Sequence, residues 1–197
     1  MSEGVSESWW LCHGPFLACL MPFVVMMTSI AGNTLGPDPA EALMHMTGEW
    51  AARFLILALL MSPLRNLHGS RRWLLMRRML GLFAFFYGCL HLLLFLHFFL
   101  GWSPARVAEE LVERPYITAG FGAWLVMLPL AATSTRAMQR RLGRLWVRLH
   151  RGVYLCAVLI CLHILWQARS DLAEALAYSL IFGGLLAWRV KRYLRRN

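Results

Sequence analysis

The sequence consists of long apolar runs separated by short polar or basic segments. Six runs approach the length of a membrane-spanning helix, at about 11–31, 45–64, 79–100, 116–133, 149–166 and 172–188. A helix needs roughly 20 apolar residues to cross the hydrocarbon core of a bilayer. The pattern therefore predicts an all-α membrane protein, a six-transmembrane-helix bundle that forms a single domain over residues 1–197.

Two of the polar connections have a recognisable local chemistry. Residues 32–42 are rich in glycine and proline, which is typical of a turn-containing loop. In the connection 101–115, Ser103 is a candidate N-cap and Pro104 a candidate first helical residue, with acidic residues in the following turns. This pattern predicts a short interfacial helix, which either docks a partner or simply joins two spans.

Composition agrees with the membrane class and excludes several others. Hydrophobic residues make up 59% of the chain and charged residues 15%, with a mean hydropathy of +0.54, so no room remains for a soluble catalytic domain. The sequence contains no HExxH, GxSxG, P-loop or GxGxxG motif, which removes the residues that hydrolysis or nucleotide binding would need. The net charge of +10 arises in loops between apolar runs and therefore indicates topology rather than nucleic-acid binding.

The basic residues are distributed unevenly over the loops. The segments 65–78, 134–151 and 189–197 hold 5, 6 and 5 basic residues. The alternate loops hold only Arg106, Arg114 and Arg169, and eight of the ten acidic residues lie in or beside them. Loops rich in lysine and arginine stay on the cytoplasmic side. This predicts that both termini are cytoplasmic.

Two histidines lie deep in apolar runs that cross in the same direction under this topology. His91 follows Arg78 by 13 residues and His163 follows Arg151 by 12. A rise of about 1.5 Å per residue places both roughly 18–20 Å above the inner boundary, in the outer half of the bilayer. Histidines on neighbouring helices can hold one haem iron. The alternative is that each makes a buried hydrogen bond to a backbone carbonyl.

His150 lies near the inner boundary and allows two interpretations. It is 13 residues before His163, about 3.6 turns, so a regular helix presents the two side chains on different faces. It is either an axial ligand of a second, inner haem, with Arg77 or Arg78 near the propionates, or an interfacial residue bonded to lipid or loop.

His45 lies at the start of the second run and is either a ligand, a proton carrier, a partner contact or a structural residue. His13, His68 and His97 are predicted to be peripheral.

Six stretches carry a resemblance to a known family: GPDPAEALMHMTGEWA, SPLRNL, RRMLGLFAFFYGCLHLLLF, ERPYITAGFGAW, ATSTRAMQRRLGRLWVRLHRGVYL and LHILW. They run through nearly all of residues 36–166. The chain resembles the MsrQ (YedZ) family of haem-binding membrane subunits of bacterial methionine sulfoxide reductase systems. That family belongs with the ferric-reductase-like transmembrane domains.

The resemblance implies a haem b protein of the bacterial inner membrane, with one haem or two. His91, His150 and His163 stand at the family's candidate axial-ligand positions, and His45 matches a further family histidine. Arg77 stands where related oxidases have the inner histidine of the same helix. The family is expected to pass electrons from membrane quinol to a periplasmic molybdopterin enzyme, MsrP, which reduces methionine sulfoxide in oxidised envelope proteins. FMN is also attributed to the family, but no flavin motif is present.

Two other functions remain open at this stage. One is a transmembrane ferric or quinone reductase that needs no dedicated partner. The other is a haem-free scaffold or small transporter, although transporter sites usually combine broken helices with polar groups at the midplane. If the partner is MsrP, the loops 32–42 and 101–115, which carry Asp38 and Glu109, are the candidate contacts.

Overall fold

The computed structural model describes residues 3–70, 72–168 and 172–195, and every regular element among them is a helix. Six helical segments in this part of the chain are long and apolar enough to cross a membrane, which confirms the predicted six-helix membrane fold. They are formed by α1 (Glu3–Ala31), α2 (Pro39–His68), α3 (Arg72–Leu94) with the π-helical turn η1 (Phe95–Phe99), α5 (Pro115–Ala132), α7 (Arg144–His150) together with α8 (Gly152–Gln167), and α9 (Leu172–Leu194). The side on which each terminus lies stays a prediction, and Arg169 falls outside the described residues.

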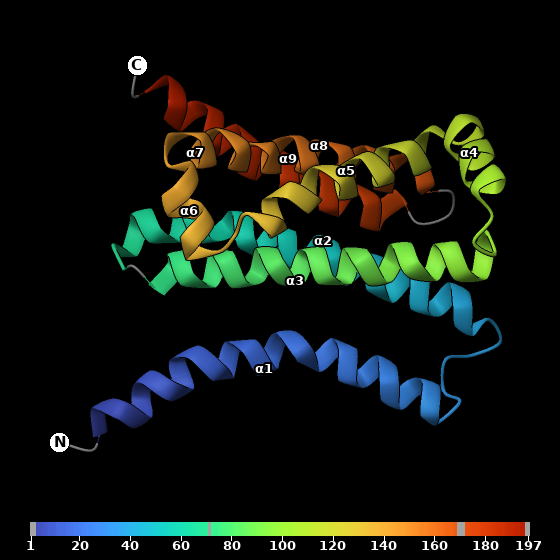
Figure 1. The fold of residues 1–197 in the computed structure, drawn as a ribbon, viewed down its shortest axis with the longest axis horizontal. Coiled ribbons are helices and arrows are strands. Elements are labelled where there is room, and N and C mark those ends of the chain that lie inside the picture. Colours follow the sequence, from blue (N-terminus) through green and yellow to red (C-terminus); the bar gives the residue numbers. More distant parts are fainter. Residues whose placement is uncertain (1–2, 71, 169–171, 196–197) are drawn as a thin grey trace. The chain divides into compact units, whose positions relative to one another are not determined.

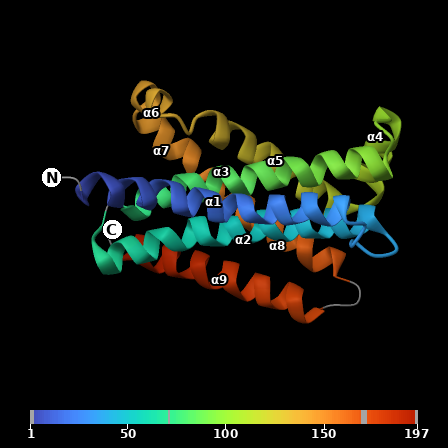
Figure 2. The ribbon, with the colours of Figure 1, turned by 90° about the horizontal axis from the view of Figure 1, so that it is seen from below.

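The chain divides into two compact units, residues 1–94 and 95–197, which are described separately. In the first unit α1, α2 and α3 run along one another (Figure 1, Figure 2). The Asp38 side chain caps α2 by accepting from the Glu41 N–H at 3.0 Å, and Pro39 takes the first helical position. Gly69 ends α2 in a left-handed conformation (φ 68°) that glycine adopts without strain. These local signals fix where the α2–α3 hairpin begins and turns.

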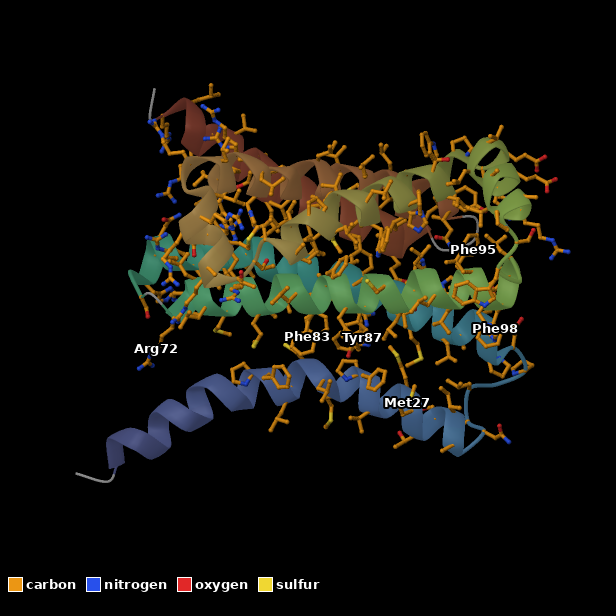
Figure 3. All side chains as sticks on the ribbon, viewed as in Figure 1. Met27, Arg72, Phe83, Tyr87, Phe95 and Phe98 are labelled. Carbon is orange, nitrogen blue, oxygen red and sulfur yellow. The ribbon has the colours of Figure 1, made fainter. Side chains whose placement is uncertain are left out.

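A tyrosine from α3 holds α1 in the first unit. The Tyr87 hydroxyl donates to the Cys19 carbonyl and accepts from the Phe23 N–H, both at 3.0 Å. Those two backbone groups are one helical turn apart in α1, close to Pro22. The Tyr87 side chain is fully buried, and it points with Phe83 from α3 toward α1 (Figure 3). The contact therefore fixes the packing of α1 at a specific point along α3.

In the second unit α8 packs against both α5 and α9. The short helix α4 (Pro104–Glu113) precedes α5, with Ser103 as its N-cap, which confirms the predicted short helix; its place at the membrane interface stays a prediction. α5 ends at Ala132, so the carbonyls of its last turn have no following helical N–H groups to accept from. The hydroxyls of Thr133 and Ser134 donate to the carbonyls of residues 129 and 130 at 2.6 and 2.7 Å, so these backbone oxygens keep a donor.

The segment 134–151 differs from the sequence-based expectation of a basic loop. It contains two short helices, α6 (Arg136–Leu142) and α7 (Arg144–His150), separated by Gly143 with φ 49°. Arginine, leucine, methionine and glutamine are strong helix formers, and Thr135 caps α6 on the Met138 N–H at 3.2 Å. The span predicted over 149–166 lies within the candidate membrane span Arg144–Gln167, in which α7 ends at His150 and α8 begins at Gly152.

Candidate functional site

His91 lies on α3 and is seated against α2. Its Nδ1 is 2.9 Å from the Met44 carbonyl oxygen. The ring also lies against the backbone of Gly48, where a Cβ atom would come within 3.1 Å of both Nδ1 and Cε1. Met44 is one helical turn before Gly48, so the ring spans that turn of α2. We call this arrangement of histidine, carbonyl and glycine the His91 seat.

His163 lies on α8 and is seated against α5 in the same way. Its Nδ1 is 2.7 Å from the Tyr116 carbonyl oxygen. A Cβ atom on Gly120 would lie 2.8 Å from Nδ1, 2.9 Å from Cε1 and 3.2 Å from Cγ of the ring. The carbonyl residue is again one turn before the glycine. We call this arrangement the His163 seat.

The two seats share one construction, which the positions of the histidines alone do not predict. In both, the histidine follows its carbonyl partner by 47 residues and the glycine follows that partner by four. The histidines also stand in nearly identical pentapeptides, CLHLL at 89–93 and CLHIL at 161–165. This short internal repeat was a signal present in the sequence. The glycines carried no such signal, because their role depends on which helix packs against which.

The hydrogen bonds determine which ring nitrogen carries the proton. A carbonyl oxygen only accepts, so Nδ1 of His91 and of His163 must donate. The neutral tautomer with hydrogen on Nδ1 has its lone pair on Nε2. This is the form in which histidine ligates metals, and a carbonyl on the other nitrogen fixes the ring orientation. The predicted carbonyl bond and the predicted ligation are therefore compatible, because they use different nitrogens, and the seats fit haem iron.

An arginine at the start of α5, beside the His163 seat, makes an ion pair and a hydrogen bond. Arg114 precedes α5, where it bonds the Tyr116 hydroxyl at 3.5 Å and the Glu110 carboxylate at 3.2 Å. The hydrogen bond to Tyr116 and the negative charge of Glu110 raise the pKa of the Arg114 guanidinium. The Thr118 hydroxyl also donates to the Leu111 carbonyl. These contacts join α4 to the turn that supplies the Tyr116 carbonyl.

His150 is the last residue of α7 and belongs to a different environment. Its ring stacks on Trp146, with ring centroids 3.9 Å apart and planes inclined by 24°. Its Nδ1 lies 3.2 Å from the Trp146 carbonyl, and the Trp146 indole donates to the Thr133 carbonyl at 3.0 Å. Both of these contacts to the His150 ring come from its own helix. Ligation by His150 stays a prediction.

The arginines proposed to accompany an inner haem lie near the start of α3. Arg77 is half-buried and Arg78 is exposed. Arg77 precedes His91 by 14 residues, a rise of about 21 Å along the helix. Arg77 and His91 therefore lie at different depths along α3, and the role of Arg77 and Arg78 beside an inner haem stays a prediction.

His45 is not part of the His91 seat although it follows Met44 directly. Its side chain is 55% exposed, and its Nε2 lies 3.8 Å from Glu41 one turn earlier. The ring thus leaves α2 on a different side from the carbonyl that His91 uses. A ligand role for His45 finds no comparable support in its contacts.

The remaining histidines were predicted to be peripheral. His97 is exposed, and its Nδ1 accepts from the Trp102 indole at 3.1 Å, so its tautomer is opposite to that of the seated histidines. His68 is also exposed, with Nδ1 3.1 Å from the carbonyl one turn earlier. The side chain of His13 lies outside the described residues.

An ion pair near the middle of α2 was not singled out from the sequence. Arg53 contacts the Glu49 carboxylate at 2.8 Å and lies 5.0 Å from the centre of the Trp50 ring. Ionisable residues within a spanning helix are costly and usually functional. The i, i+4 spacing of an acid and a base was the available signal. Glu49 directly follows Gly48, so the pair is continuous with the His91 seat.

Comparisons with known proteins show the family to which the chain belongs. A family model described as ferric reductase like transmembrane component matches residues 47–161. A relative from Xanthomonas euvesicatoria pv. vesicatoria (strain 85-10), named protein-methionine-sulfoxide reductase heme-binding subunit MsrQ, is 46% identical over 82% of this chain and 74% of its own length. A relative of the same name from Rhodospirillum rubrum is 45% identical over 92% of this chain and 88% of its own length. The chain therefore belongs to the ferric reductase like transmembrane family and, within it, to the MsrQ family.

Proposed function

We propose that this chain is the haem-binding membrane subunit of a protein-methionine-sulfoxide reductase system and carries electrons across the membrane. The names of its relatives support haem binding and the reductase system. We further propose that the donor is membrane quinol, that the acceptor is a periplasmic molybdopterin reductase of the MsrP type, and that the membrane is the bacterial inner membrane.

The observation that carries the proposal is the pair of histidine seats. His91 and His163 each keep the Nδ1 proton on a carbonyl of the neighbouring helix, at 2.9 and 2.7 Å. Both would ligate the iron of haem b through Nε2. When bound, haem b supplies a one-electron redox couple within the membrane. The chain orients each imidazole through the carbonyl bonded to Nδ1, which leaves Nε2 to face the metal.

A second haem is a separate part of the proposal. His150 would be its ligand, and Arg77 and Arg78 would provide positive charge for its propionates. The stacking of His150 on Trp146 supports a fixed ring, but its position at the end of α7 differs from both seats. Haem stoichiometry decides this point. A value near two that falls in His150→Ala supports the inner haem, whereas a value near one that His150→Ala leaves unchanged removes it.

The partner surface follows from the proposed orientation. With the basic loops on the cytoplasmic side, the loop 32–38 and α4 face the periplasm. Both carry acidic side chains, among them Asp38 and Glu109. Photo-crosslinkers placed at these two positions should capture the molybdopterin subunit. Crosslinking to that subunit only from sites in 134–151 would show that the proposed orientation is wrong.

The direct test uses the purified chain in lipid nanodiscs with a reduced quinol analogue, the purified molybdopterin partner and a peptide containing methionine sulfoxide. We expect reduction of the peptide to require the chain, the quinol analogue and the molybdopterin partner, and to be lost in His163→Ala. The match to ferric-reductase-like proteins favours one other candidate, a ferric reductase that needs no partner. Equal turnover of ferric citrate with and without the partner, and no reduction of the peptide, would select that candidate. Fluorescence of acid-released flavin tests the attributed FMN in the same samples.

A further inference from the structure

We propose that Gly48 and Gly120 are positioning residues of the two histidine seats. The absence of a side chain at each lets an imidazole lie against the helix backbone with Nδ1 on the carbonyl one turn earlier. This inference deepens the proposed function and rests on it in one respect, namely that the seated rings serve a metal. The packing of each histidine ring against its glycine does not depend on the proposed function.

The contact at Gly120 is the tighter of the two. A Cβ atom there would lie 2.8 Å from Nδ1 of His163, closer than carbon and nitrogen approach without a bond. The atom it meets is the one that donates to Tyr116 at 2.7 Å. The ring therefore cannot swing away from an alanine without stretching or breaking that hydrogen bond. Replacing Gly120 acts on the orientation of His163 and on its tautomer together.

The contact at Gly48 is less severe. A Cβ atom would lie 3.1 Å from Nδ1 and from Cε1 of His91, so a shift of a few tenths of an ångström would relieve it. The Met44 carbonyl also accepts from the Thr47 hydroxyl at 3.0 Å, and Thr47 has a second acceptor at 2.8 Å in the Leu43 carbonyl. The geometry thus predicts an order: Gly120→Ala disturbs its histidine more than Gly48→Ala disturbs His91.

Other glycines on the helices of the two seats provide matched controls. A Cβ atom on Gly81 in α3 would meet nothing within 4 Å. A Cβ atom on Gly122 in α5 would reach only Leu159, at an ordinary 3.7 Å. Alanine is favoured over glycine inside a helix, so Gly81→Ala and Gly122→Ala should be neutral or stabilising. Any loss seen at Gly48 or Gly120 but not at these sites comes from the histidine.

The first experiment measures how firmly the full chain holds haem and how its ligands are oriented. Haem release to excess apomyoglobin and the low-spin EPR spectrum are recorded for the four alanine variants and wild type. Loss of an outer-shell partner of a metal ligand typically weakens binding about 10- to 100-fold. We expect Gly120→Ala to release haem about 10-fold faster or more and to shift the EPR g values. Gly48→Ala should follow with a smaller change, and the two controls should match wild type.

The second experiment separates a clash with the ring from any other role of the glycine. The thermal midpoint of the full chain is measured for Gly120→Ala with His163 present and in a His163→Ala background. We expect alanine to lower the midpoint only when the imidazole is there to be displaced. An equal drop in both backgrounds, or no drop together with wild-type haem release, would overturn the inference.

The outcomes separate the inference from the proposed function. If His163→Ala keeps its full haem, the ligand assignment fails, while the thermal comparison still decides whether Gly120 seats the ring. If His163→Ala loses haem but Gly120→Ala behaves like Gly122→Ala, the ligand assignment stands and the positioning role is wrong.

Discussion

The buried hydroxyl of Tyr87 is expected to hold α1 on α3, and Tyr87→Phe removes only that oxygen. Two hydrogen bonds of 3.0 Å are lost, to Cys19 and Phe23, in a side chain that is fully buried. Each such bond contributes about 0.5–1.5 kcal/mol net. The two released backbone groups lie one turn apart in the same helix and can bond each other. We therefore expect a loss of about 1–2 kcal/mol rather than the sum of two unsatisfied groups.

Two measurements test this prediction. Thermal or denaturant unfolding of the full chain reports the loss of stability. Maleimide labelling of Cys19, read by peptide mass spectrometry, reports the release of α1, because Cys19 is only 5% exposed in the folded chain. The control is Thr28→Val, which removes an exposed hydroxyl bonded within α1 and should change neither readout. Unchanged stability and unchanged Cys19 labelling in Tyr87→Phe would refute the reasoning.

Three further predictions concern single sites. Asp38→Ala removes the N-cap of α2 and should lower stability by about 1 kcal/mol, which Asp38→Asn should largely restore in the same unfolding assay. Arg53→Met leaves Glu49 without its partner in a spanning helix and should cost about 1–3 kcal/mol. The double variant Arg53→Met/Glu49→Leu should recover most of that loss, and failure to recover would indicate a contact beyond the pair. His97→Ala removes an exposed ring and should leave the haem absorption spectrum unchanged.

The fold was largely predictable because its signals are local. Apolar length located the six spans, and Asp38, Ser103 and Pro104 marked helix starts through capping chemistry. The helices within 134–151 were missed since a run of arginines suggested a solvated loop. The span predicted over 149–166 lies within Arg144–Gln167, which α7 and α8 form together.

The candidate site was predictable only in part, for a physical reason. The histidines are conspicuous because an ionisable group deep in an apolar run is rare. The other half of each seat is a backbone carbonyl and a glycine, and neither can be recognised as part of a site from the sequence. A backbone carbonyl is present at every residue, and a glycine matters here only because a particular helix packs on it. The repeated CLHLL and CLHIL pentapeptides are the sequence feature that links the two histidines.

The most direct test of the account is haem content per chain with the reduced-minus-oxidised spectrum, for wild type, His91→Ala, His163→Ala and His97→Ala. The account predicts a b-type spectrum with two histidine ligands in wild type and in His97→Ala. It predicts loss of most haem in His91→Ala and in His163→Ala. Full haem retention with an unchanged spectrum in His163→Ala would contradict the assignment of the seats as ligand sites.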